Sequence, residues 1–177
     1  MIETPRLSMR VWRHEDVAEL IRVTNTPRVM EHFGGVQPAE TFDAAYARMR
    51  QSLADDGFCF WILERRHDGA ILGICGLKRG TVDPIMGEIE IGWRLREDCW
   101  GQGYAREAAE ASLAWAWAHL ACAKIFAITV PGNARSWGLM ERLGMRRRRD
   151  LDFAHPNFAA DHPLSAHITY EIARPGN

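Results

Sequence analysis

The segment that most constrains the fold of this chain is rich in alanine and runs from about residue 104 to 120. After its first turns it is apolar nearly all round, with Leu113 and Trp115 among the alanines. A helix with this composition is expected to be buried against a sheet. Alternating, strand-like segments precede it at 87–95 and follow it at 124–130.

The rest of the chain reads as hairpins followed by alternating strands and helices. Further strands are expected at 7–12, 58–64, 71–77, 145–153 and 167–172, and further helices at 14–23, 39–54 and 134–143. This order predicts an α/β fold around one mixed sheet. A chain of 177 residues without repeats or linkers is expected to form a single domain, residues 1–177.

Composition excludes several classes of function. The net charge is -1, and the basic run at 146–149 is followed by Asp150 and Asp152, so we expect a solvated strand and no nucleic-acid partner. An RNA-binding patch on that run is the alternative. No apolar run is long enough to span a membrane.

The cysteines and histidines have no pattern that predicts a cofactor. The cysteines are widely spaced, which favours free thiols and a cytoplasmic location. The histidines near the C-terminus lack the spacing of metal ligands, so no metal is expected. These residues are Cys59, Cys75, Cys99, Cys122, His155, His162 and His167.

A glycine-rich turn, Trp-Gly-Gln-Gly-Tyr-Ala at 100–105, joins a predicted strand to the alanine-rich helix. Its glycines allow the backbone to approach a ligand closely, and the free N–H groups of a helix N-terminus favour an anion. The turn therefore predicts a phosphate or pyrophosphate site, with an ordinary tight turn as the alternative. A Walker A motif is absent, and Arg106 replaces the third glycine of a dinucleotide fingerprint.

Taken with four other segments, this turn resembles the GNAT acetyltransferase superfamily. The resemblance is greatest to the branch that contains the ribosomal-protein-alanine N-acetyltransferases. It rests on Thr-Pro-Arg-Leu at 4–7, Glu-Ile-Gly-Trp at 90–93, the turn and helix start at 100–108, Asn-Ala-Arg-Ser at 133–136 and Leu-Gly-Met at 143–145.

The resemblance implies a GNAT fold, with a mostly antiparallel sheet of about seven strands, about four flanking helices and a central splay for coenzyme A. It implies transfer of an acetyl group from acetyl-CoA to a primary amine, either a protein α-amine or a small molecule, by direct attack in a ternary complex. A homodimer is possible on this fold. The implied coenzyme-binding residues are Trp93, Leu95, Trp100, Gly101, Gln102, Gly103, Tyr104, Ala105, Arg106 and Asn133. Trp100 departs from the family, which usually has Gln or Arg at this position.

Two glutamates are candidates for the general base. The acceptor amine must be neutral to attack, although a lysine-type ammonium has a pKa of about 10.4. Glu88 and Glu90 alternate with isoleucines, so both carboxylates are expected on one strand face leading into the turn. Either could be the base, and a pair of surface glutamates is the alternative.

The proton donor to the departing thiolate is less clearly marked. Many GNAT enzymes use a tyrosine at the position of Met140, which has no proton to give. Ser136 or water is the remaining candidate, and a hydrogen bond at the helix N-terminus is the alternative for Ser136. Met140 and Trp100 also motivate a second function, a catalytically silent module that binds or senses acyl-CoA.

Overall fold

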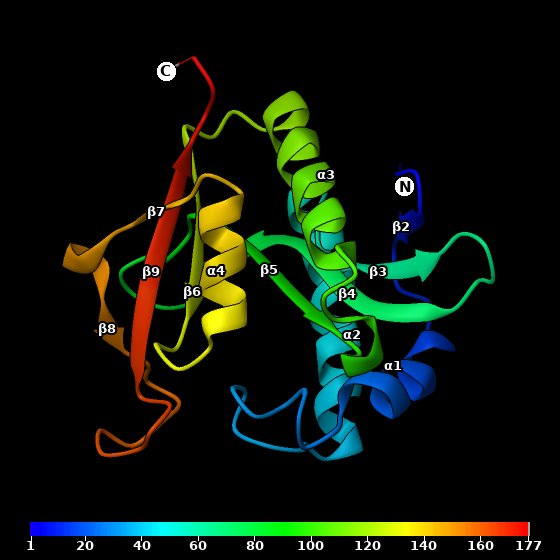
Figure 1. The fold of residues 1–177 in the computed structure, drawn as a ribbon, viewed down its shortest axis with the longest axis horizontal. Coiled ribbons are helices and arrows are strands. Elements are labelled where there is room, and N and C mark those ends of the chain that lie inside the picture. The colour runs from blue at the N-terminus through cyan, green and yellow to red at the C-terminus, as the bar shows by residue number, and fades with distance from the viewer. Residues whose placement is uncertain (177) are drawn as a thin grey trace.

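The computed structural model describes residues 1–176 and shows one extended β-sheet with helices on both faces (Figure 1). The strand order is β1-β2-β3-β4-β5-β6-β9-β7, and β8 pairs with β9. Neighbouring strands are antiparallel except for β5 and β6. The strands are β1 (Ile2–Glu3), β2 (Leu7–Arg10), β3 (Phe60–Arg65), β4 (Ile71–Arg79), β5 (Ile89–Leu95), β6 (Lys124–Thr129), β7 (Arg146–Arg147), β8 (Phe153–Ala154) and β9 (Ala166–Ala173).

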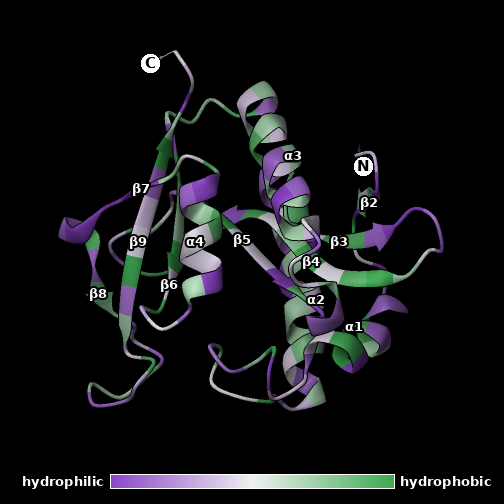
Figure 2. Cartoon of the chain, viewed as in Figure 1, coloured by the Kyte–Doolittle hydropathy of each residue, from purple (hydrophilic) through white to green (hydrophobic). Residues whose placement is uncertain are grey.

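The main helices are α1 (Asp16–Thr24), α2 (Ala39–Asp56), α3 (Tyr104–His119) and α4 (Ala134–Arg142). In Figure 1, α3 and α4 lie in front of the sheet, and α2 lies behind it. Figure 2 shows hydrophobic residues along the central strands β4 and β6, which these layers cover. This architecture confirms the predicted α/β fold around one mixed sheet; the strands beyond the expected seven include two-residue segments such as β1 and β7.

Alternation along β4 and β5 assigns side chains to the two faces of the sheet. Cys75 on β4 lies 3.8 Å from the Ser112 hydroxyl of α3, so its face is covered by α3. Arg94 on β5 reaches Phe42 of α2, with 5.2 Å between guanidinium carbon and ring centre. Because side chains alternate along a strand, Glu90 shares the α2 face with Arg94.

One expectation about local structure is confirmed and another is wrong. The α3 helix packs against the sheet as predicted and buries Ala108, Ala109 and Leu113 on one face. The expected continuous strand at 145–153 is interrupted by a 3₁₀ turn, Arg149–Leu151. Arg147 pairs with Asp152 and Arg148 with Asp150, and these local ion pairs accompany a bent rather than an extended chain.

No helix in residues 1–176 is long and apolar enough to cross a membrane.

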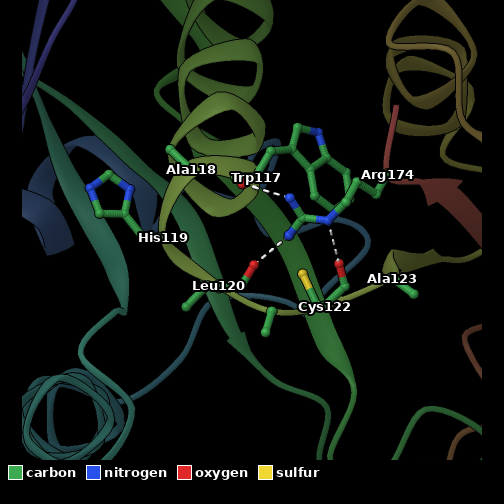
Figure 3. Close-up of a pocket in the computed structure, with 8 residues that line it drawn as sticks. Trp117, Ala118, His119, Leu120, Cys122, Ala123 and Arg174 are labelled. Atoms are coloured by element: carbon green, nitrogen blue, oxygen red, sulfur yellow. Dashed lines mark hydrogen bonds between the residues drawn. The ribbon is translucent and has the colours of Figure 1, made fainter. Parts of the chain in front are cut away.

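Arg174 closes the C-terminal end of α3 (Figure 3). Its guanidinium donates to the carbonyl oxygens of Trp117 at 2.7 Å and Cys122 at 3.0 Å, and also to that of Leu120. Carbonyls at a helix end lack intrahelical partners, and a cation there also meets the negative end of the helix dipole. The shallow pocket around these residues is therefore part of the helix cap, at the opposite end of α3 from the glycine-rich turn.

We expect Arg174→Met to lower the free energy of unfolding by about 2 kcal/mol, because several carbonyls lose a charged donor. Arg174→Lys should recover less than half of this loss, since one ammonium cannot reproduce the fork of a guanidinium. Urea unfolding measures both effects, with the exposed Arg50→Met on α2 as the control. Equal midpoints for Arg174→Met and the wild type would show that the cap is not stabilising.

Candidate functional site

The central feature of the site is the separation of β5 from β6. These parallel strands share one register position, Glu90 opposite Phe126, and then diverge (Figure 1). Toward β4, backbone bonds join Arg96 to Leu72 and Gly80 to Glu88, both at 2.8 Å. Antiparallel pairing alternates, so the even-numbered residues of β5 bond to β4 and the odd-numbered ones face β6.

The backbone groups of Trp93 and Leu95 consequently face the gap between the strands. The Leu95 carbonyl accepts a hydrogen bond from the Trp100 indole at 2.9 Å. Trp93 lies one alternation earlier and is half-buried. The gap thus offers an extended ligand the backbone hydrogen bonds of a sheet edge.

The glycine-rich turn ends at the N-terminus of α3. Gly101 has φ +75° and Gly103 has φ +83°, a left-handed conformation that favours glycine. The first intrahelical bond runs from the Glu107 N–H to the Gly103 carbonyl. Within the described chain, the N–H groups from residue 101 to 106 donate to no protein acceptor, which leaves a run of donors for an anion.

The N-terminal segment holds this turn in place. Glu107 accepts hydrogen bonds from the Thr4 hydroxyl at 2.6 Å and the Arg6 N–H at 2.9 Å, and it pairs with the Arg6 guanidinium at 2.6 Å. Arg6 also donates to the Gln102 carbonyl at 2.9 Å. Sequence reasoning missed this clamp, although both ends lie in segments that carried the family resemblance.

Two arginine side chains flank the Trp100 ring. The guanidinium carbon of Arg135 lies 4.9 Å from its ring centre, and that of Arg28 lies 5.9 Å away. Arg106, the cation expected from the sequence, instead pairs with Glu110 at 2.7 Å on the exposed side of α3. The positive charge near Trp100 therefore comes from Arg28 and Arg135, which sequence spacing did not indicate.

Glu90 is buried and paired. Its carboxylate lies 2.5 Å from the Lys78 ammonium, directly across the β4–β5 ladder. Burial raises the pKa of Glu90, although Lys78 acts in the opposite direction. Glu88 differs: it is exposed and lies immediately before β5. The two glutamates, expected on one strand face, thus occupy different environments.

The loop after β8 reaches the same region. Burial lowers the pKa of His155, and the charges of His167 and Lys78 lower it further. The ring centres of His155 and His167 are 4.7 Å apart.

No group of three or more His, Cys, Asp or Glu side chains within residues 1–176 could hold a metal ion.

The start of α4 borders the gap. The Asn133 amide donates to the Thr129 hydroxyl at 3.0 Å, so its side chain does not cap the helix. Ser136 is half-buried, and its hydroxyl has no partner among the described side chains and backbone. Met140 is 1% exposed and lies in the hydrophobic core, so the usual tyrosine position contributes packing here.

A splayed pair of parallel strands beside a glycine-rich helix N-terminus agrees with the family comparison. The family model described as "Acetyltransferase (GNAT) domain" matches residues 6–146. The chain belongs to the GNAT acetyltransferase family.

Individual relatives of this GNAT chain show how widely the fold is shared. The Bacillus subtilis (strain 168) protein YkkB, described as uncharacterized, is 29% identical over 149 residues, 84% of this chain and 86% of its own. A Bacillus anthracis GNAT acetyltransferase structure matches with a TM-score of 0.79 at 23% identity, covering 98% of each chain. A Vibrio cholerae spermidine N-acetyltransferase, solved with CoA and spermine, matches with a TM-score of 0.73 at 16% identity, covering 97% of each.

We expect Lys78→Met to destabilise the GNAT fold by about 2 kcal/mol at pH 8, because it leaves the buried Glu90 carboxylate without its cation. The pKa of Glu90 should rise further, so the folded protein holds a proton that the unfolded chain releases. Stability of the variant then falls as pH rises, and its deficit should be smaller at pH 5.

Urea unfolding at the two pH values measures this difference. Lys124→Met is the matched control, since its partner Glu171 keeps the Arg148 guanidinium at 2.5 Å. A deficit of equal size at pH 5 and pH 8 would contradict the assignment of the effect to Glu90.

Proposed function

We propose that this chain is an acetyl-CoA-dependent N-acetyltransferase that acts on a primary amine by direct attack in a ternary complex. The observation that carries the proposal is the run of unpartnered N–H groups from residue 101 to 106, beside the gap between β5 and β6. Acetyl-CoA supplies the acetyl group as a thioester. The proposal treats residues 1–177 as one catalytic domain.

The proposed coenzyme site fits the donors that are present. The N–H groups of Gly101, Gln102, Gly103, Tyr104, Ala105 and Arg106 would hold the pyrophosphate, with Arg28 and Arg135 as nearby cations. The backbone of Trp93 and Leu95 would bind the pantetheine arm in the gap. Asn133 would contact the same arm from the other side, which is consistent with its position at the end of β6.

We propose Glu90 as the general base. Its raised pKa makes it a stronger base than an exposed glutamate, and it faces the side of the sheet covered by α2. Glu88 is exposed and lines a shallow pocket near Lys124, at the end of β5 away from the glycine-rich turn. Glu90 would take the proton of the acceptor ammonium directly or through water, while Lys78 holds its carboxylate in place.

Ser136 would assist the departing sulfur. Its unpartnered hydroxyl at the start of α4 would donate to the thiolate and relay a proton from water. By analogy with cysteine, whose thiol has a pKa of about 8.5, the coenzyme thiolate needs little help near neutral pH, so the contribution should be modest.

The acceptor is either a protein α-amine or a small-molecule amine. The motifs at 4–7 and 100–108 favour the branch of ribosomal-protein N-terminal acetyltransferases. The first test incubates the protein and acetyl-CoA with a panel containing peptides with free N-termini, polyamines and amino acids, and measures thiol release. Binding of coenzyme A without thiol release from any amine would support the silent module instead.

We expect Arg106→Glu to weaken acetyl-CoA binding at least tenfold, because it adds a negative charge to the first turn of α3, next to the pyrophosphate site. The helix itself should tolerate an acidic residue there. Calorimetric titration gives the affinities, and Ala114→Glu on the exposed side of α3 is the control. Gly103→Val is a poorer test, because a valine at φ +83° would strain the backbone. Equal affinities for the two charge variants would reject the site.

We expect Glu90→Gln to lower turnover on the order of 10²–10⁴-fold while keeping the side-chain shape. The wild type should lose activity as pH falls through the raised pKa of Glu90, and the variant should lack that limb of the pH–rate profile. Glu88→Gln is the control and should retain most of the rate. The reverse result, with Glu88→Gln inactive and Glu90→Gln active, would transfer the role to Glu88.

A further inference from the structure

Among residues 1–176, Arg94 on β5 is a cation without an acidic partner. Its Nε atom is buried and has no hydrogen-bond partner, which is true of no other buried side-chain nitrogen or oxygen in residues 1–176. Its Nη1 atom lies 3.7 Å from the Met30 sulfur, a weak acceptor. The rings of Phe42 and Phe33 also flank it, with ring centres 5.2 and 5.8 Å from the guanidinium carbon.

Arg10 provides an internal comparison. It is similarly enclosed, but its guanidinium contacts Asp16 and Glu64, each at 2.8 Å. Asp16 raises the pKa of Arg10, whereas burial lowers the pKa of Arg94 to about 10. The fold therefore supplies carboxylates to one enclosed arginine and none to the other.

An unpaired, enclosed guanidinium is costly to a folded protein. Burying a charge without a partner is unfavourable, and an apolar residue of similar length would suit the surroundings of Met30 and Phe42 better. Buried polar atoms without partners in a native fold call for an explanation, such as a ligand that completes them. The missing partner here is an acceptor group with negative charge.

The position of Arg94 connects it to acetyl transfer. Glu90 and Arg94 lie on the same face of β5. Their Cα positions are about 13 Å apart along the strand, at 3.3 Å per residue. Phe33, which lies over the guanidinium, is 46% exposed, so only a thin apolar cover separates Arg94 from solvent. The next residue of that loop, Gly34, faces the Phe158 ring of the loop after β8.

We propose that Arg94 binds the carboxylate of the acceptor, so that the preferred acceptors are primary amines that carry a carboxylate, such as free amino acids. This inference rests on the proposed N-acetyltransferase function. A guanidinium fork matches a carboxylate in a bidentate geometry. A single cation in an apolar setting suits a monoanion better than a phosphate dianion, which would need further donors.

Matched acceptors test the proposal. Tyrosine is compared with tyramine, and histidine with histamine, so that each pair differs by one carboxylate. We expect the wild type to favour the carboxylate-bearing member by roughly 10- to 100-fold in kcat/KM, mainly through KM. In Arg94→Met this ratio should fall to near one. A ratio near one in the wild type, or an unchanged ratio in the variant, would overturn the proposal.

Binding measurements separate this proposal from the function on which it rests. In the presence of coenzyme A, N-acetyltyrosine should bind the wild type at least tenfold more tightly than N-acetyltyramine, and Arg94→Met should lose the difference. If no amine is acetylated but this difference is present, the enzyme assignment fails and the carboxylate site stands. If the two compounds bind equally, the carboxylate site fails whatever the turnover.

Stability distinguishes a ligand-binding arginine from a structural one. Arg94→Met should unfold at the same or a higher urea concentration than the wild type, because it replaces an unpaired charge by an apolar side chain. Arg10→Met, which strands two carboxylates, should unfold at a clearly lower concentration. A comparable loss in both variants would show that Arg94 serves the fold, and would overturn the proposal.

Discussion

The site depends on the short pairing between β5 and β6, which share a single register position. They pair at Glu90 and Phe126 and separate beyond it, so the backbone groups of β5 past this position have no partner strand on that side. Unpaired backbone donors and acceptors are unfavourable unless water or a ligand satisfies them. The packing of α3 against β4 and β5, and of α4 against β6, supports the two strands separately. The gap is thus a consequence of two halves of one sheet being covered by different helices.

The same arrangement explains why distant segments of the chain meet at the glycine-rich turn. Glu107 in the first turn of α3 receives Thr4 and Arg6 from the N-terminal segment. These bonds satisfy the carboxylate with neighbours outside its own helix, so the N–H groups of the first turn are left available. An acid at a helix N-terminus also favours the helix through its dipole. The clamp therefore fixes the position of the turn without occupying its donors.

Charged groups enclosed by the α1 and α2 side of the sheet fall into two kinds. Arg10 with Asp16, and Lys78 with Glu90, are pairs whose partners lie within the chain. Arg94 has a weak sulfur contact and two aromatic rings instead. An ion pair formed within the chain holds its side chains in one geometry, whereas an unpaired arginine can still gain interaction energy from a ligand. This distinction separates the ion-paired residues, among them the proposed base Glu90, from Arg94, which we assign to the acceptor carboxylate.

Local patterns in the sequence determined much of the fold. Alternation located the central strands and apolar periodicity located the helices; Gly144, just after α4, has φ +82°, a conformation that commonly ends a helix. The turn at 100–105 was recognisable because positive φ and free helix donors depend on nearby residues. Tertiary structure alone decided which charges meet: Glu88 and Glu90 alternate in sequence, yet only Glu90 is buried opposite Lys78. The same is true of the clamp on Glu107, the cations beside Trp100 and the surroundings of Arg94, which all bring together residues far apart in the chain. Burial and ion pairing are set by packing between elements and not by the spacing within them.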